Sequence, residues 1–270
     1  MEFTQVLNSL SSLFKPSSLT KKTSYPFTVM ILSPHPDDES ITSSLALRLM
    51  HENNFHVVNV AVTLGSNTAR QEERKKELEE ACELLEFENV FLHENWKTKE
   101  KELKSLIQKY QPQLIIAPHV KDFHPTHVKT GELLKKVLPS FKKVNFLVAW
   151  SEFWNPLSKP NILVEVQQEI LELQFNALVK HAGEVKRNPF HLRLPAWMMD
   201  NVRRGSEIVA GTGAEATSMA FGVLYQLQLF KNAKLSTIKL QKNFLTSEED
   251  IGQMFKLILD AASGSRTKVK

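Results

Sequence analysis

Short apolar runs alternate with longer amphipathic segments between residues 27 and 150. The runs 28–32, 56–64, 89–93, 113–119 and 145–150 read as strands, and 40–52, 69–85, 99–110 and 127–138 have helical spacing. The strand runs are continuously apolar, which is typical of strands buried on both faces. The pattern therefore predicts an α/β fold with a mostly parallel sheet and helices on both faces. Ligands of such sheets bind at the carboxyl ends of the strands.

The alternation of strand-like and helix-like segments becomes less regular after residue 150. We expect a loop and strand over 151–166, one long helix over 167–185, and further helices over 196–211 and 216–230. Residues 233–270 read as a C-terminal strand and helix extension that ends in a basic tail. Residues 1–24 have the spacing of an amphipathic arm. The expected organisation is thus an arm over 1–24, a main α/β domain over 25–232 and the extension over 233–270.

Composition narrows the functional classes. The formal net charge is +4 over 270 residues, but the basic residues are scattered and lack interleaved aromatics, so we expect no nucleic-acid partner. The single cysteine, Cys82, excludes a disulfide framework. No apolar run approaches the roughly 20 residues of a transmembrane helix, and the N-terminus lacks a secretory h-region. A cytoplasmic protein without an integral membrane segment is expected.

A cluster of ionisable residues follows the first predicted strand. The stretch "HPDDE" places His35, Asp37, Asp38 and Glu39 within five positions. Helix capping and the helix macrodipole favour one or two acids there, but they explain neither His35 nor the position at the ligand-binding edge. Like charges repel when they are crowded and desolvated, so the cluster suggests a bound cation.

A second cluster follows the strand run 113–119. The stretch "DFHPTH" holds Asp122, His124 and His127. In each cluster one histidine precedes a proline, which holds the histidine extended and favours a helix start directly after it. Because both clusters follow strands at the same sheet edge, we expect them to converge.

Together the clusters provide the ligands of a catalytic metal. His35, Asp38 and His127 form a two-histidine, one-carboxylate set, which is the ligand count of a catalytic zinc site with one open position. His35 and Asp37 with a distant histidine also match the facial triad of non-haem Fe(II) oxygenases, although those enzymes favour a different scaffold. Zinc is the expected cofactor, with Fe(II) or another divalent metal as the alternative.

The remaining polar residues then have catalytic roles. Asp37 is placed to take a proton from metal-bound water, and His124 to stabilise a developing oxyanion. Asp122 is expected to orient His124, and Glu39 to orient a metal ligand. His119 fits a packing residue at a strand end, and His181 is expected on the surface. Trp154 is a candidate for carbohydrate stacking.

The stretches "SPHPDDES", "TLGSNTARQEERKKELEEACELL" and "DFHPTH" resemble the PIG-L/LmbE-like N-deacetylases. The likeness spans about residues 28–221. It implies a Rossmann-like sheet and a zinc-dependent hydrolase that removes acetyl from an N-acetylated amino sugar. By this resemblance Arg74, followed by Glu77 in the family's helix pattern, is a substrate contact. The chain departs from the family pattern at Thr126, where an acid is usual.

Two alternatives to this hydrolase stay open at the level of sequence. One is a non-catalytic sugar-binding or partner-binding member of the same fold, which Thr126 motivates. The other is the Fe(II) oxygenase. The expected partner is a small N-acetylated substrate, and a homo-oligomer is compatible with the sequence. The sequence does not indicate whether the substrate is an amino sugar, a chitooligosaccharide, a lipid-linked sugar or a non-sugar amide.

Overall fold

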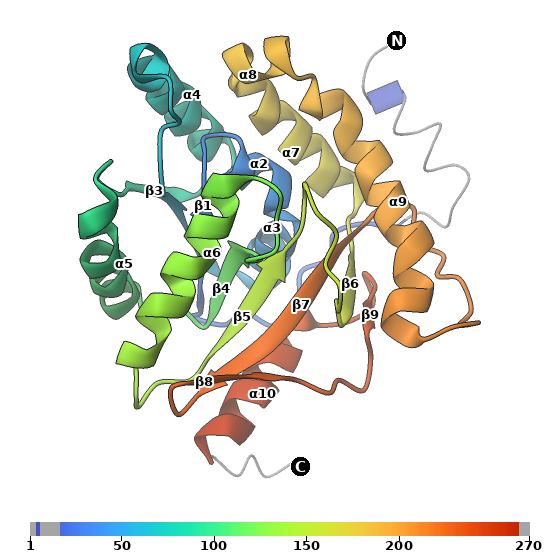
Figure 1. Ribbon diagram of the computed structural model, residues 1–270. Helices are drawn as coiled ribbons and strands as arrows, with labels where there is room; N and C mark the ends of the chain where they lie inside the picture. Colours follow the sequence, from blue (N-terminus) through green and yellow to red (C-terminus); the bar gives the residue numbers. More distant parts are fainter. Residues whose placement is uncertain (1–3, 6–16, 265–270) are drawn as a thin grey trace.

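The computed structural model describes residues 4–5 and 17–264. Most of the predicted N-terminal arm and the basic tail 265–270 lie outside the described residues. A nine-stranded sheet forms the centre, with the order β3-β2-β1-β4-β5-β7-β6-β9 and β8 beside β7 (Figure 1). The α/β class with a mostly parallel, helix-covered sheet is therefore confirmed. The strand bounds are β1 Thr28–Ser33, β2 His56–Ala61, β3 Glu88–Phe91, β4 Leu114–Pro118, β5 Phe146–Ser151, β6 Ile162–Glu165, β7 Gly222–Lys231, β8 Lys234–Thr237 and β9 Phe244–Leu245.

Helices cover both faces of this sheet. The helices α5 and α6 lie on the face seen in Figure 1, and α3, α4, α7 and α10 pack on the opposite face. Successive residues of β1 alternate between two cores: Val29 and Ile31 join the larger one, while Met30 and Leu32 join the one under α5 and α6. The helix bounds are α2 Asp38–Thr42, α3 Ser44–Asn53, α4 Gln71–Leu84, α5 Trp96–Tyr110, α6 Pro125–Val137, α7 Gln168–Lys180, α8 Ala182–Arg187, α9 Phe190–Ala210 and α10 Ile251–Ser263.

The chain reverses its direction of travel across the sheet at β1. From β1 the chain runs outward to β2 and β3, then returns to β4 on the other side of β1. All these strands are parallel, so their carboxyl ends share one edge. Ligands of open α/β sheets bind where the strand order reverses in this way. Both histidine motifs follow strands that meet at this point.

Four expected helices differ from the structure. The helix expected over 40–52 is divided at Ser43 into α2 and α3. A helix was expected over 216–230, but residues 222–230 belong to β7, which lies antiparallel between β5 and β6. Its buried Val223, Leu224 and Tyr225 are an apolar run whose period does not separate strand from helix. The long helix over 167–185 is broken at His181 into α7 and α8, and the helix expected over 196–211 begins earlier, at Phe190.

The C-terminal segment joins the same sheet. β8 pairs with β7, β9 pairs with β6, and α10 packs against α3. The fully buried Arg48 links these parts: it pairs with Glu52 and donates hydrogen bonds to the carbonyl oxygens of Glu165, Leu245 and Thr246. One buried guanidinium thus satisfies three backbone acceptors on two separate segments.

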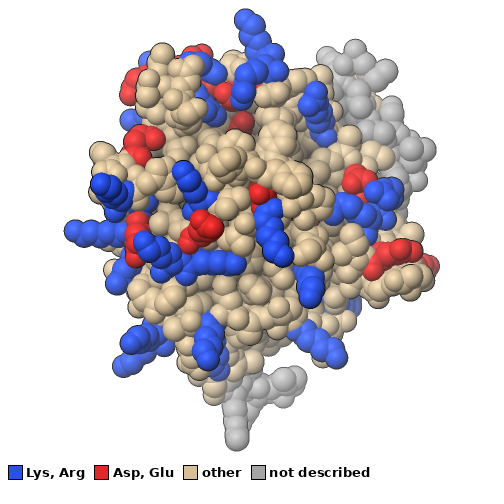
Figure 2. All heavy atoms as spheres, in the orientation of Figure 1, with Lys and Arg blue, Asp and Glu red and all other residues tan. Residues whose placement is uncertain are grey.

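Charged side chains are spread over the surface. Figure 2 shows Lys and Arg across the whole face seen in Figure 1, with acidic residues among them. Among the described residues, no helix combines the length and apolarity that a membrane span requires.

We predict that Arg48→Met lowers the free energy of unfolding by about 3–5 kcal/mol, because Glu52 would keep a buried charge without its main partner. The double variant Arg48→Met with Glu52→Leu should recover part of this loss. Chemical denaturation measures both. A loss below about 1 kcal/mol for the single variant would contradict the role given to Arg48.

Candidate active site

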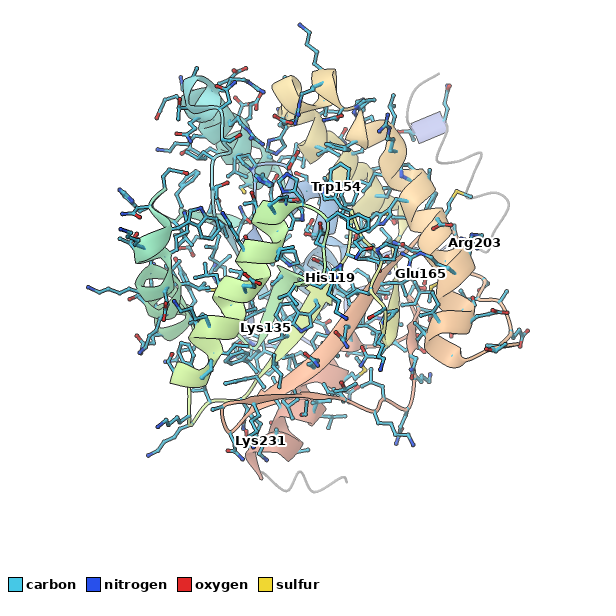
Figure 3. The ribbon with its side chains drawn as sticks, viewed as in Figure 1. His119, Lys135, Trp154, Glu165, Arg203 and Lys231 are labelled. Carbon is cyan, nitrogen blue, oxygen red and sulfur yellow. The ribbon has the colours of Figure 1, made fainter. Side chains whose placement is uncertain are left out.

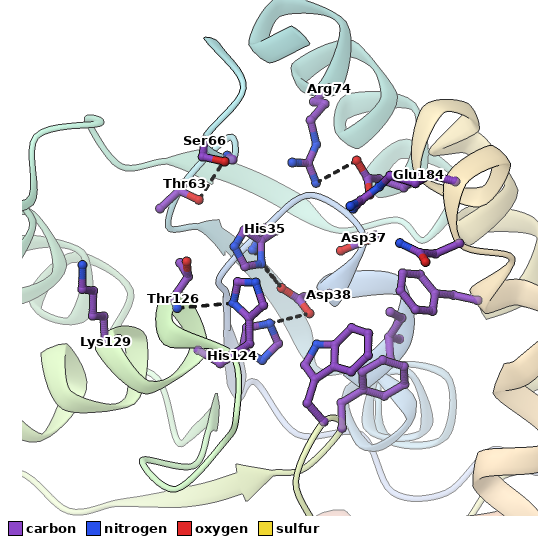
Figure 4. A pocket seen from close by; sticks show the side chains of 18 of the residues that line it. His35, Asp37, Asp38, Thr63, Ser66, Arg74, His124, Thr126, Lys129 and Glu184 are labelled. Atoms are coloured by element: carbon purple, nitrogen blue, oxygen red, sulfur yellow. Dashed lines mark hydrogen bonds and ion pairs between the residues drawn. The ribbon is translucent and has the colours of Figure 1, made fainter.

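Both histidine motifs meet in one pocket at the switch point. The pocket has a volume of about 500 Å³ and opens above the carboxyl ends of β1 and β4 (Figure 4). Its lining includes six of the sequence-predicted residues: His35, Asp37, Asp38, Arg74, His124 and His127. Glu39 and Asp122 lie behind this wall and are buried.

The turn after β1 has a strained backbone. Asp37 stands directly before α2 with a φ of +119°, a region that residues other than glycine rarely adopt. Two carboxylates hold the turn: Asp38 accepts a hydrogen bond from the backbone N–H of His35 at 2.8 Å, and Glu39 accepts one from that of Asp37 at 2.9 Å. The backbone geometry at Asp37 is therefore fixed by the side chains that follow it.

His35, Asp38 and His127 have the spacing of metal ligands. One oxygen of Asp38 lies 3.4 Å from Nδ1 of His35, and the other lies 3.4 Å from Nε2 of His127. Ligands arranged tetrahedrally at zinc bond lengths are about 3.4 Å apart. His124 is also close, since its ring nitrogens and those of His35 and His127 fall within 4.8 Å of one another. The donor set therefore fits a divalent metal, either through Asp38 or through the third histidine.

Asp122 supports both histidines of the second motif. One of its oxygens accepts the backbone N–H of His124 at 2.8 Å, and the other lies 3.6 Å from Nδ1 of His127. Burial alone would lower the pKa of His127, but the carboxylates of Asp38 and Asp122 raise it to about 10. A carboxylate on Nδ1 fixes the ring and makes Nε2 a stronger metal ligand.

The pKa values of the two aspartates diverge. Burial raises the pKa of Asp37 well above its usual range, and the neighbouring Asp38 raises it further. Burial acts in the same direction on Asp38, but His127 and His35 outweigh it and hold the pKa of Asp38 below its usual range. Adjacent carboxyl groups with opposite shifts are typical of sites where one binds a cation and the other carries a proton.

Glu39 makes a contact that sequence reasoning missed. Its carboxylate lies 2.7 Å from Nε2 of His181, at the break between α7 and α8, and both side chains are fully buried. His181 is therefore an internal residue, and the expectation of a surface histidine was wrong. Because its partner stands 142 residues away, sequence spacing gave no signal for this pair. Glu39 supports the turn at Asp37 rather than a metal ligand.

Arg74 reaches the pocket from α4. Its guanidinium donates to the carbonyl oxygen of Pro36 at 2.9 Å and lies 3.8 Å from the carboxylate of Glu184 (Figure 4). Glu94 also lines the pocket and accepts the backbone N–H of Leu64. These groups place charged hydrogen-bonding side chains opposite the histidines.

Residues 30–138, which contain both histidine motifs, match the PIG-L family, described as GlcNAc-PI de-N-acetylase. The resemblance of the sequence to this family is thereby confirmed over these residues. Among curated proteins, no sequence matches this chain significantly.

Solved structures with this fold include enzymes of different activity. The N,N'-diacetylchitobiose deacetylase of Pyrococcus horikoshii is 19% identical over 84% of this chain and 93% of its own, with a TM-score of 0.58. GalB, the 4-carboxy-2-hydroxymuconate hydratase of Pseudomonas putida, is 13% identical over 80% and 99%, with a TM-score of 0.61. The zinc-inhibited form of the teicoplanin deacetylase Orf2 is 12% identical over 77% and 98%, with a TM-score of 0.56. These likenesses confirm the Rossmann-like fold.

We predict that His181→Gln lowers the free energy of unfolding by about 3–5 kcal/mol, because it leaves Glu39 buried without its charged partner. His56→Gln is the matched control, since His56 forms an exposed pair with Glu88 and should cost less than about 1 kcal/mol. Equal losses in both variants, measured by denaturant unfolding, would contradict the importance of burial.

The same pair should make stability depend on pH. Glu39 has a lowered pKa in the folded protein, so its contribution is present above its unfolded pKa of about 4.3 and is lost below that value. His181 has a raised pKa, so its contribution is complete below about pH 6.5 and is lost as the pH rises through the folded value. We therefore expect the stability difference between wild type and His181→Gln to be largest near pH 5–6. A difference that grows above pH 7 would contradict this sign.

Proposed function

We propose that the protein is a metal-dependent hydrolase that removes acetyl from an N-acetylated substrate. The observation that carries the proposal is the convergence of His35, Asp38 and His127 on one pocket, with Asp37 beside them. The PIG-L match and the two deacetylase neighbours support an acetylated sugar as the substrate. GalB has a similar fold and a different activity, so the assignment depends on the site residues.

His35, Asp38 and His127 would hold the metal. A divalent ion bound there would polarise a carbonyl oxygen and lower the pKa of water. Asp38 is preferred over His124 as the third ligand because it lies 3.4 Å from both other donors. This choice leaves His124 free to contact the substrate.

Asp37 acts as the proton carrier. Because burial and Asp38 raise the pKa of Asp37, its carboxylate accepts a proton from water more readily than an exposed aspartate does. The proton held on its carboxyl oxygen is then available to the departing amine nitrogen. Without that proton the amine would leave as an unstable anion.

His124 stabilises the oxyanion. Its Nδ1 accepts the backbone N–H of Thr126 at 3.3 Å, so the neutral ring carries its proton on Nε2. Burial, together with the nearby His35 and His127, lowers the pKa of His124 and favours this neutral form. The Nε2–H group is then a hydrogen-bond donor for the substrate carbonyl oxygen as negative charge develops.

Metal removal and Asp37→Asn test the activity. We expect a chelator to abolish acetate release from N-acetylglucosamine compounds, and Zn²⁺, Fe²⁺ and Co²⁺ added separately to identify the metal that restores it. Asp37→Asn should keep the metal and lower kcat by on the order of 10²–10⁴. Acetate release that survives both changes would refute the hydrolase, and hydration of an unsaturated acid without acetate release would favour the activity of GalB.

The ligand set can be tested separately by metal content. We predict that Asp38→Asn loses the metal, while His124→Asn retains it and lowers kcat by about 10²–10³. The asparagine side chain preserves the hydrogen bond to the backbone of His35, which makes Asp38→Asn a conservative probe. Elemental analysis of both purified variants decides the point: metal lost from His124→Asn and kept by Asp38→Asn would assign the three-histidine set.

A further inference from the structure

One wall of the pocket exposes a tryptophan. Of the seven large apolar side chains that are exposed among residues 4–5 and 17–264, Trp154 is the one that lines the pocket. Its side chain is 44% exposed. Burying the apolar surface of an indole is favourable, and an exposed indole lacks this stabilisation. The position of Trp154 at the opening of a binding pocket therefore points to a ligand that covers the ring.

Other aromatic rings hold this indole in place. Phe153 and Phe190 contact it edge-on, with ring centroids 5.2 Å and 5.6 Å away. Phe190 comes from the start of α9 and Phe153 from the loop after β5, so two elements support the ring from different directions. A ligand that stacks on Trp154 therefore meets a ring that is already ordered.

The loop that carries Trp154 is also fixed to the catalytic motif. Glu152 accepts the backbone N–H of Leu157 across the loop at 2.5 Å. The carbonyl oxygen of Asn155 lies 2.8 Å from Nε2 of His119, and the Asn155 amide donates to the carbonyl oxygen of Lys121. Figure 3 shows His119 and Trp154 at the same end of the sheet. Because Lys121 precedes Asp122 and His124, the position of Trp154 is set relative to the catalytic histidines.

The surroundings of Trp154 favour a hydroxylated ring over an acyl chain. The indole gives the pocket a flat apolar surface, while Asn188, Arg187 and Ser66 supply hydrogen-bonding groups elsewhere in its lining. A pyranose ring has one apolar C–H face and a rim of hydroxyl groups, which matches this combination. A pocket of about 500 Å³ falls in the range of ligands with more than one ring.

We propose that Trp154 forms a second sugar subsite, so that the preferred substrate carries another pyranose next to its N-acetylated sugar. This inference depends on the proposed deacetylase function, because the acetamido group is taken to lie at His35, Asp38 and His127. Trp154 is then a specificity-determining residue that contacts the substrate away from the reacting bond.

Kinetics with two probes test the subsite. Acetate release by the metal-loaded protein is measured with N-acetylglucosamine and with its β-1,4-linked N-acetylated disaccharide. We expect kcat/KM to favour the disaccharide by on the order of tenfold, the scale of one stacking contact. Trp154→Ala should remove this preference through KM and leave kcat/KM for the monosaccharide within about twofold. Trp154→Phe should restore most of the preference.

Trp197→Phe is the matched control. Trp197 contacts Phe153 in the same aromatic cluster, with centroids 5.3 Å apart, but it does not line the pocket. Its substitution should leave the preference for the disaccharide unchanged. Equal losses for both sugars in Trp154→Ala would show a structural role for Trp154 and overturn the subsite. Faster turnover of N-acetylated amines with an acyl chain than of the disaccharide would overturn the sugar assignment.

Calorimetry with the metal-free protein separates the subsite from the proposed function. The disaccharide should bind wild type about tenfold more tightly than Trp154→Ala, and the monosaccharide should bind both equally. If neither sugar releases acetate but this binding difference is found, the deacetylase proposal fails and the subsite stands. If acetate is released and Trp154→Ala binds the disaccharide as wild type does, the subsite fails alone.

Discussion

The constraint on which the site depends is the burial of three consecutive acids at the end of a central strand. Asp37, Asp38 and Glu39 are each less than a tenth exposed. A buried carboxylate is costly unless a cation or several hydrogen bonds compensate it. The structure meets this demand for Asp38 and Glu39 with histidine partners, while burial of Asp37 raises its pKa and so favours its protonated form. These partners surround the candidate active site.

Each partner comes from a different part of the chain. Asp38 faces His35, just after β1, and His127, in the first turn of α6, while Glu39 faces His181 at the α7–α8 break. The break follows from this contact, because His181 turns its ring into the core with φ −78° and ψ 61°, outside helical geometry. Asp37, whose backbone is strained, directly precedes these two anchored residues. Its carboxyl group is thereby left without a cationic side chain at ion-pair distance among the described residues, which suits a group that must exchange a proton.

The sequence predicted the positions of the motifs better than their supporting contacts. Continuous apolar runs identified β1, β2, β4 and β5, and the polar clusters directly behind β1 and β4 had to reach the same sheet edge. β7 was not predicted because Val223, Leu224 and Tyr225 are all buried. A strand buried on both faces lacks the alternation of apolar and polar residues by which a strand is recognised. The Glu39–His181 pair was not predicted because local sequence patterns carry no information about a contact between segments so far apart. Asp122 was expected to orient the ring of His124, yet it contacts that residue through the backbone and faces the ring of His127.

The replacement of the usual acid by Thr126 is consistent with catalysis by His124. An acid at this position would lie close to His124 and raise the pKa of its imidazole, which favours the doubly protonated ring. Thr126 adds no charge, and its backbone N–H donates to Nδ1 and so keeps the proton of the neutral ring on Nε2. Burial lowers the pKa of His124, and the nearby His35 and His127 lower it further. A neutral donor with a fixed tautomer stabilises an oxyanion by a hydrogen bond without adding a third positive charge to a site built to hold a dication. Thr126 therefore distinguishes this chain from the family pattern without removing a group that the proposed reaction needs.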